Sequence, residues 1–303
     1  MITLPEDFYL EETRSGYLVT KKMKRIWAVQ LDLLNTFADV CEENNLQYFL
    51  NGGTLLGAVR HQGFIPWDDD VDVMMPREDY NRLCDISGAV FRHPYFFQTS
   101  LTERGLFRTH AQLRNSSTTG YILTDENKKI NKGIFLDIFV LDGIPENKWI
   151  RRIHKERIGL WKKMLAYAYD RDSSTGKKRV FRNFYQQVLR VLPFEKQFRY
   201  FDRKVLAKYS RKNTKVIGDL TLQWNEKVHW DAGLFSGYEY MQFEGRKFRV
   251  PAGYHEILEK QYGNYKKLPE KEDRNKNEHG ALCIDPDIPY TEYQKPVLPL
   301  EQI

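Results

Sequence analysis

Residues 66–73 read PWDDDVDV, with four aspartates in five positions directly before an apolar run. Clustered carboxylates repel one another, and burying them is unfavourable unless a cation or hydrogen-bond donors compensate them. Residues 71–75 alternate like a strand, which puts Asp70 and Asp72 on one face and turns Asp69 away. Taken alone, the stretch fits either a cation site at the start of a strand or a solvated acidic turn, with a calcium site as a further alternative.

A turn and a third carboxylate accompany this stretch. An apolar run over 48–50 ends in Gly52-Gly53-Thr54, where two glycines permit a tight turn and Thr54 is placed to cap a following helix. The backbone N–H groups of such a helix start suit phosphate oxygens. A β-rich run over 133–141 then carries Asp137. Converging carboxylates favour hard divalent ions such as Mg²⁺, so the parts together predict a phosphoryl-transfer site. A hydrogen-bonded core aspartate is the alternative for Asp137.

Hydrophobic periodicity predicts a mixed α/β (α+β) fold, and 303 residues with 41% hydrophobic content suffice for one large domain with an insert. The expected elements are a helix over 21–46, strands over 48–50, 71–75, 95–99, 111–114 and 133–141, a helix between 76 and 83, a hairpin around 243–246 and a helix after Pro251.

The three cysteines are widely spaced and odd in number, which argues against disulfides and a zinc site. The first residues, MITLPEDFYLEE, lack the basic and apolar regions of a signal peptide, and no apolar run approaches 18 residues. These features predict a cytoplasmic protein, with the inner face of the membrane as a further location.

The net charge of +6 is unevenly distributed. Residues 147–212 hold 20 Lys/Arg against 5 Asp/Glu, about +15, so the remainder carries about −9. We therefore divide the chain into a catalytic core over 1–146, a basic and mostly helical insert over 147–215, broken near 173–176, and a C-terminal part over 216–303 that completes the core.

Three blocks of the chain resemble the LicD family of phosphocholine transferases, within the nucleotidyltransferase superfamily. The first is YFLNGGTLLGAVRHQGFIPWDDDVDVMMP at 48–76, the second is GIFLDIFVLDGIP at 133–145, and the third is the segment FEGRKFRVPAGYHEILEKQYGNYKKLPEKEDRNKNEHG at 243–280. The resemblance spans nearly the whole chain outside the basic middle. It implies a nucleotidyltransferase-like mixed sheet flanked by helices. Fukutin-type transferases of ribitol phosphate are distant kin.

The resemblance also implies a reaction: transfer of phosphocholine from CDP-choline to a sugar hydroxyl, with release of CMP. Carried onto this chain, Asp70, Asp72 and Asp137 would be the metal and catalytic carboxylates, with Mg²⁺ or Mn²⁺ as cofactor. Asp68 would be an accessory ligand, and Asp137 could also take the acceptor proton. The residues expected at the phosphates are Gly52, Gly53 and Thr54, with Arg60, Arg77 and Arg114 as neutralising cations.

Several of these residues have plain structural alternatives. Each arginine could equally form a surface ion pair, and His279, matched to the third block, could be merely packed. A choline head requires aromatic faces. Trp67, Trp224, Trp230 and Tyr121 are the candidates, with Trp67 favoured because it adjoins the acidic stretch.

The basic middle permits three interpretations. It could contact an anionic membrane surface, where lipid-linked glycan precursors are found, bind an anionic polymer, or be an ordinary insert with a solvated basic face. Nucleic acid is disfavoured because no reading motif is present.

We therefore expect a metal-dependent transferase acting on a cell-surface glycan precursor of the teichoic acid or lipopolysaccharide type. The alternatives are transfer of ribitol or glycerol phosphate from a CDP donor, transfer of a nucleotide from an NTP, and a catalytically silent binding module. The acceptor sugar and oligomeric state stay open.

Overall fold

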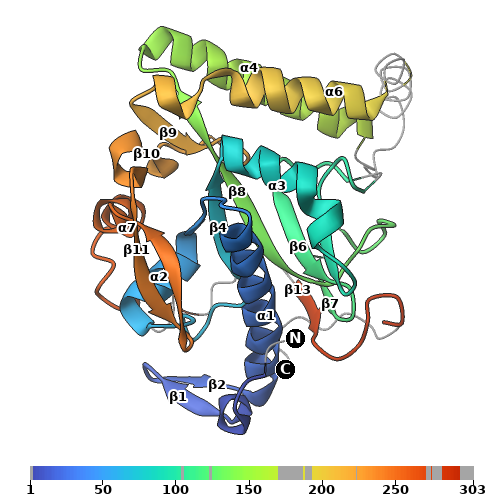
Figure 1. Cartoon of the computed structure of the whole chain (residues 1–303), viewed down its shortest axis with the longest axis vertical. Coiled ribbons are helices and arrows are strands. Elements are labelled where there is room, and N and C mark those ends of the chain that lie inside the picture. The colour runs from blue at the N-terminus through green and yellow to red at the C-terminus, as the bar shows by residue number, and fades with distance from the viewer. Residues whose placement is uncertain are drawn as a thin grey trace.

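The computed structural model describes residues 3–103, 106–122, 125–169, 193–222, 224–270 and 282–293, together with Gln187 and Arg274. Figure 1 shows a central sheet with helix α1 (Lys21–Glu43) in front of it and a pair of helices, α4 (Lys148–Tyr169) and α6 (Phe194–Tyr200), at one end. The predicted mixed α/β fold is confirmed.

The central sheet has seven strands, and one long strand organises it. Strand β8 (Ile134–Ile144) pairs in parallel with β4 (Asp72–Pro76), while its other edge pairs antiparallel first with β6 (Ala111–Asn115) and then with β9 (Val216–Asp219). The remaining strands of this sheet are β3 (Phe49–Leu50), β5 (Tyr95–Gln98) and β10 (His229–Asp231). Because β8 runs the length of the sheet, residues at its two ends lie in two separate environments.

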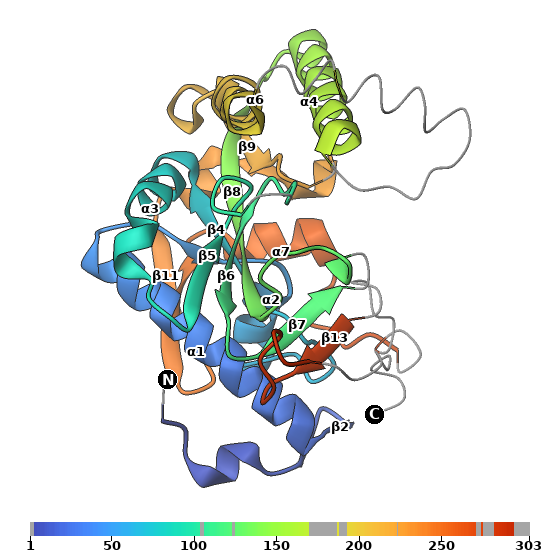
Figure 2. The same ribbon diagram turned by 90° about the vertical axis from the view of Figure 1, so that its right-hand side faces the viewer.

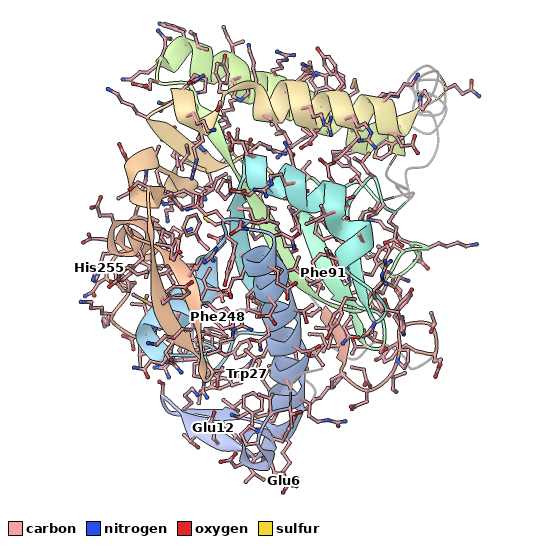
Figure 3. All side chains as sticks on the ribbon, viewed as in Figure 1. Glu6, Glu12, Trp27, Phe91, Phe248 and His255 are labelled. Atoms are coloured by element: carbon pink, nitrogen blue, oxygen red, sulfur yellow. The ribbon has the colours of Figure 1, made fainter. Side chains whose placement is uncertain are left out.

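Helix α1 is buried nearly all round because it has neighbours on two sides. It packs on β6 and β8, and Arg246 of the hairpin β11 (Tyr238–Phe243) and β12 (Arg246–Pro251) donates to its Asn35 at 2.9 Å. Trp27 and Phe248 are fully buried between these elements (Figure 3). Helix α1 is thereby a rigid support, and Thr20 caps its start by accepting from the N–H of Met23.

The other elements complete the core. Helices α2 (Gly52–His61) and α3 (Arg77–Val90) follow β3 and β4 directly, and α7 (Tyr254–Tyr262) follows the hairpin. Two small sheets are formed by β1 (Glu12–Arg14) with β2 (Tyr17–Val19), and by β7 (Thr119–Ile122) with β13 (Leu282–Asp285). Periodicity had not indicated β7 and β13, two strands of four residues that pair across more than 150 positions.

The basic middle has an apolar core of its own. Ile158 and Leu165 of α4 pack with Phe198 of α6 and with Ile144 at the end of β8. Figure 2 shows these helices beside β9 and away from β2. The expected break near 173–176 lies outside the described residues, and the division into three parts stays a prediction. Among the described helices none is both long and apolar enough to cross a bilayer.

Candidate active site

The acidic stretch is anchored by two side chains of α1. The indole N–H of Trp27 donates to the carbonyl oxygen of Asp68 at 3.0 Å, and the Gln30 amide donates to the carbonyl of Asp69. The Trp27 ring is stacked on Phe64 with centroids 4.6 Å apart. The backbone of the acidic stretch is therefore held by the buried core, which fixes where its carboxylates lie.

Three consecutive carboxylates gather at this place. Oxygens of Asp68, Asp69 and Asp70 lie within 4.8 Å of one another. Asp69 is only 7% exposed, so the prediction that it turns away from its neighbours is wrong. The strand begins at Asp72, and alternation along a strand does not apply to the irregular residues before it.

Asp72 and Asp137 face each other across neighbouring strands. They are register partners in the parallel pair β4–β8, and the Asp137 N–H donates to the carbonyl of Val71 at 3.0 Å. The Asp72 N–H donates to Thr54 Oγ1 at 2.8 Å. Thr54 therefore does not cap α2, which starts at Gly52; it ties that helix to the first residue of β4 instead.

Electrostatics separates these carboxylates into two kinds. Burial, reinforced by Asp70 and Asp137, raises the pKa of Asp72 well above its usual range, and burial with Asp70 and Asp69 does the same for Asp68. Burial also opposes ionisation of Asp137, but His110 and a 2.7 Å hydrogen bond from Gln112 lower its pKa overall.

Both glycines of the turn are explained by close approach. A Cβ on Gly53 would lie 2.4 Å from Asp68 Oδ2, and one on Gly52 would lie 3.0 Å from Asp72 Oδ2. Gly52 also has φ +52°, a conformation that favours glycine. The Gly-Gly turn thus lets two carboxylates approach the start of α2.

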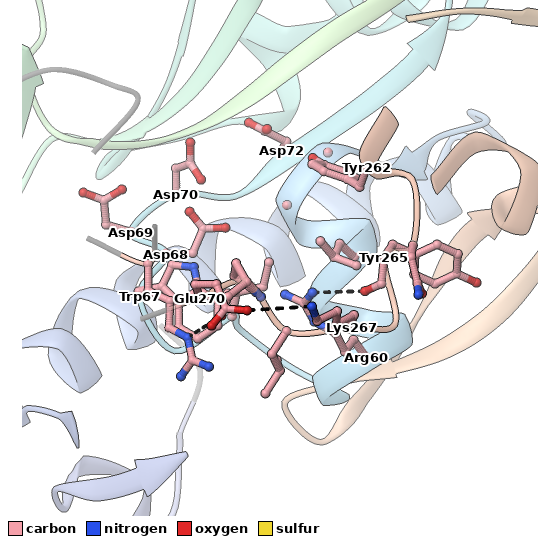
Figure 4. A pocket seen from close by; sticks show the side chains of 18 residues that line it. Arg60, Trp67, Asp68, Asp69, Asp70, Asp72, Tyr262, Tyr265, Lys267 and Glu270 are labelled. Carbon is pink, nitrogen blue, oxygen red and sulfur yellow. Dashed lines mark hydrogen bonds and ion pairs between the residues drawn. The ribbon is translucent and has the colours of Figure 1, made fainter. Parts of the chain in front are cut away.

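A pocket of about 750 Å³ opens over this turn, and we call it the Gly-Gly pocket. Figure 4 shows Asp68, Asp69 and Asp70 on one side of it together with Trp67, and Arg60, Lys267, Tyr262 and Tyr265 on the other. The residues that matter below are Gly52, Gly53, Asp68, Asp69, Asp70 and Asp72 on the acidic side, and Arg60, Trp67, Tyr262, Tyr265, Lys267 and Arg274 around them. Its volume suits a small molecule, and because carboxylates, Glu270 included, outnumber the basic side chains in its lining, an anionic ligand would need a bound cation to enter it.

A second pocket of about 260 Å³ adjoins the first, and we call it the β6 pocket. Asp69 and Asp70 line both pockets, and Asp137 lines this one. Its other polar lining residues are Arg108, His110, Gln112, Arg114 and Asp125. Asp69 and Asp70 therefore lie at the boundary between the two pockets.

Sequence reasoning missed most residues of the β6 pocket. His110, Gln112 and Arg114 are spaced by two around the start of β6, and Gln112 is the register partner of Asp137. Polar residues with a period of two in an otherwise buried strand were the available signal. The strand had been predicted, but of these three only Arg114 was singled out.

The structure treats the three predicted arginines differently. Arg60 lines the Gly-Gly pocket, where its guanidinium donates to the Tyr265 carbonyl at 3.0 Å. Arg114 lines the β6 pocket but is 1% exposed and donates to neutral acceptors, among them Gln98 at 2.6 Å and the Gly133 carbonyl at 2.7 Å.

Arg77 is not brought to the site. It is buried at the far end of β4 and β8, where it pairs with Asp142 at 2.6 Å and Asp202 at 2.7 Å. A bidentate partner inside the fold explains this arginine, and the expectation that it meets phosphate is wrong. His279 lies outside the described residues.

The four aromatic candidates do not converge. Trp230 is 2% exposed beside Phe235, Trp224 packs between His154 and His229, and Tyr121 lies in strand β7. Trp67 alone lines the Gly-Gly pocket, and the Arg274 guanidinium lies 5.0 Å from its ring centroid. The Trp67 face therefore already receives a cation.

The carboxylates of Asp68, Asp69, Asp70 and Asp72 fit a divalent cation. The charged neighbours that act most strongly on Asp72 are all carboxylates, and no described lysine or arginine forms an ion pair with it. Carboxylate oxygens at this density are the donor set of Mg²⁺ or Mn²⁺. A cation bound here would offset both the burial and the repulsion that raise the pKa of Asp68 and Asp72.

Comparison with known proteins adds independent findings. The model of the LicD/FKTN/FKRP nucleotidyltransferase domain matches residues 45–148. The chain is 33% identical over 256 residues to the lipopolysaccharide cholinephosphotransferase LicD of Haemophilus influenzae, covering 81% of this chain and 92% of that protein. It is 46% identical over 50 residues to the human ribitol 5-phosphate transferase FKRP, covering 16% of this chain and 10% of FKRP.

Proposed function

The chain belongs to the LicD family of phosphotransferases, and from that premise we propose that it transfers phosphocholine from CDP-choline to a sugar hydroxyl of a cell-surface glycan precursor. The observation that carries the proposal is the boundary position of Asp69 and Asp70, which line both pockets. A donor in one chamber and an acceptor in the other would meet at these carboxylates.

The Gly-Gly pocket suits the donor. Its acidic side would hold a divalent cation through Asp70 and Asp72, with Asp137 beside them and Asp68 in support, and Mg²⁺ or Mn²⁺ bound there neutralises diphosphate charge. Arg60, on the opposite side, can donate to phosphate oxygens. The N–H groups at the start of α2 offer further donors.

The β6 pocket suits the acceptor. Asp137 is held ionised by His110 and Gln112, so its carboxylate can take the proton of a sugar hydroxyl. The hydroxyl oxygen then forms a bond to the β-phosphorus of CDP-choline as the bond from that phosphorus to the bridging oxygen breaks. The products are the phosphocholine ester and CMP, and the proton stays on Asp137 until solvent removes it.

The choline head fits the aromatic side of the Gly-Gly pocket. Trp67 and Tyr262 both line this chamber, and the Arg274 guanidinium that lies over the Trp67 ring would have to move aside for the choline head. A trimethylammonium group on these faces would gain cation–π attraction of roughly 0.5–2 kcal/mol. Replacing Trp67 by leucine should therefore raise the KM for CDP-choline about tenfold and change that for CDP-glycerol less.

The acceptor is proposed from the relative that modifies lipopolysaccharide, and a teichoic-acid-type precursor has the same reacting hydroxyl chemistry. We propose that this precursor is lipid-linked and that the enzyme acts on it at the inner face of the membrane as a peripheral protein.

The test is incubation of the purified protein and a water-soluble sugar acceptor with CDP-choline, CDP-ribitol, CDP-glycerol and each of the NTPs, with Mg²⁺ or with a chelator. The proposal predicts CMP from CDP-choline only when metal is present. CMP from CDP-ribitol alone would move the assignment toward the activity named for FKRP, and pyrophosphate from an NTP would replace it with nucleotidyl transfer.

A further inference from the structure

Helix α4 has one face that packs on the protein. His154, Ile158 and Leu165 are buried along it, at spacings of four and seven residues. Ile158 and Leu165 belong to the small core formed with α6 and the end of β8, and His154 packs on Tyr209 and Trp224. This face accounts for the position of the helix and for half of its apolar residues.

A second apolar line runs along the opposite face. Trp149, Ile153 and Leu160 follow one another at spacings of four and seven, and they are 73%, 68% and 66% exposed. We call these three residues the outer stripe. On a helix of 3.6 residues per turn the centre of the outer stripe lies roughly 140° from the centre of the packed line. No described residue covers them, and large apolar side chains at this exposure indicate an interaction surface.

Cations border the outer stripe. Lys148, Arg152, Lys155 and Lys163 are exposed on the same helix, and none forms an ion pair with a described carboxylate. Between 148 and 166, Glu156 is the one acidic residue among seven lysines and arginines, and it lies on the outer stripe itself, between Ile153 and Leu160. Helix α6 and the turn after it add Lys196, Arg199, Arg203 and Lys204, also exposed.

We propose that α4 docks on an anionic lipid bilayer through the outer stripe. A tryptophan and two aliphatic residues in line, bordered by cations, are typical of a helix that lies in the interface plane with its apolar face among the acyl chains. Each exposed cation near an anionic surface adds about 1 kcal/mol of attraction at low ionic strength. Charge complementarity favours anionic lipid over a protein partner, whose contact surface is usually depleted of charge.

Helix α4 is also tied to the rim of the β6 pocket. The Lys162 ammonium donates to the carbonyls of Leu220 and Thr221 at 2.7 and 2.9 Å, and to that of Leu222. Leu222 is 50% exposed and lines the β6 pocket. Docking α4 on lipid would thus bring the acceptor chamber to the surface that holds a lipid-linked sugar. This second step depends on the proposed function; lipid binding itself does not.

The test is co-sedimentation of the full chain with vesicles of phosphatidylcholine, with and without 30 mol% phosphatidylglycerol. The chain should bind the anionic vesicles, and the triple variant Trp149→Ser, Ile153→Ser, Leu160→Ser should bind at least about tenfold more weakly. The matched control is Leu10→Ser, Leu18→Ser, which removes two residues that are 57% and 58% exposed near the N-terminus. It should bind like the wild type.

The outcomes separate lipid docking from its rivals. Equal vesicle binding by wild type and triple variant, with both folded by circular dichroism, would overturn the proposal, and so would a dimer in sedimentation velocity that the triple variant loses. CMP release with a water-soluble acceptor should be unchanged in the triple variant. Loss of vesicle binding with intact CMP release supports docking, whereas absence of CMP release from the wild type would count against the proposed function alone.

Discussion

The two ends of the strand pair β4–β8 bury acidic groups in opposite ways. At one end Asp72 faces Asp137, and Asp70 acts on the pKa of Asp72 from the stretch before it. At the other end Asp142, which is 0% exposed, receives two hydrogen bonds from Arg77, at 2.8 and 2.6 Å. Arg77 also reaches Asp202.

The difference shows which charges the fold has compensated itself. Burial raises the pKa of Asp142, but Arg77 opposes that shift, whereas for Asp72 the neighbouring carboxylates add to it. A buried acid with its own arginine needs no ligand and stabilises one arrangement of α3 against β8. A buried acid among acids stabilises the protein only when a cation arrives from outside.

The largest expected difference in activity comes from replacing an aspartate by asparagine at each end of the strand pair. Asp72→Asn should lower CMP release from CDP-choline at least about a hundredfold, because it removes a metal-holding carboxylate. Asp142→Asn, equally conservative and more buried, should keep nearly full activity per folded molecule. Steady-state assays below the melting temperature of both variants measure this; equal loss at both ends would erase the distinction.

Replacing Arg77 should have the reverse effect, lowering stability rather than activity. Arg77→Met leaves the buried Asp142 without its bidentate partner and should lower the free energy of unfolding by about 3–5 kcal/mol. Chemical denaturation measures the loss. The pair Arg77→Met, Asp142→Leu should recover much of it, since Asp142 no longer leaves a fully buried charge and Asp202, which also loses Arg77, is 16% exposed to solvent. Unchanged stability in the single variant would show that the far end is not held by this ion pair.

A smaller effect is expected from the turn that lets the carboxylates approach. Gly53→Ala places a Cβ against Asp68 and should lower activity about tenfold through displaced carboxylates. Gly88→Ala is the matched control, because nothing lies within 4 Å of a Cβ there, and it should raise stability by roughly 0.5–1 kcal/mol. Full activity of Gly53→Ala would contradict the close approach.

The smallest effect is on pH dependence. The raised pKa of Asp68 and Asp72 means that the folded state binds protons that the unfolded state releases. Without divalent metal, the contribution of Asp68 and Asp72 to stability should therefore be full below their unfolded-state pKa of about 3.8 and be lost as pH rises through their folded-state pKa. Asp72→Asn should flatten this fall, measured as melting temperature against pH in a chelator. A wild-type profile that instead rises with pH across this range would argue that the carboxylates do not repel.

The sequence was sufficient where local patterns decide structure. The strand at Asp72, the Gly-Gly turn and the strand with Asp137 were all predicted, and their convergence followed from order along the chain. The sequence was insufficient where contacts between residues far apart in the chain decide the position of a side chain. Arg77 resembles a phosphate ligand until Asp142 and Asp202 are seen beside it. Asp69 lies before the first residue of the strand, where strand alternation does not predict the direction of a side chain. His110 entered the site because β6 pairs with β8, which one sequence does not reveal.

Mn²⁺ binding by isothermal titration calorimetry tests the comparison most directly. The wild type and Asp142→Asn, titrated with CDP-choline present, should bind Mn²⁺ with equal affinity, and Asp72→Asn should bind at least about tenfold more weakly. Equal Mn²⁺ affinity in the wild type and Asp72→Asn would contradict the claim that the uncompensated end of the strand pair is the metal site.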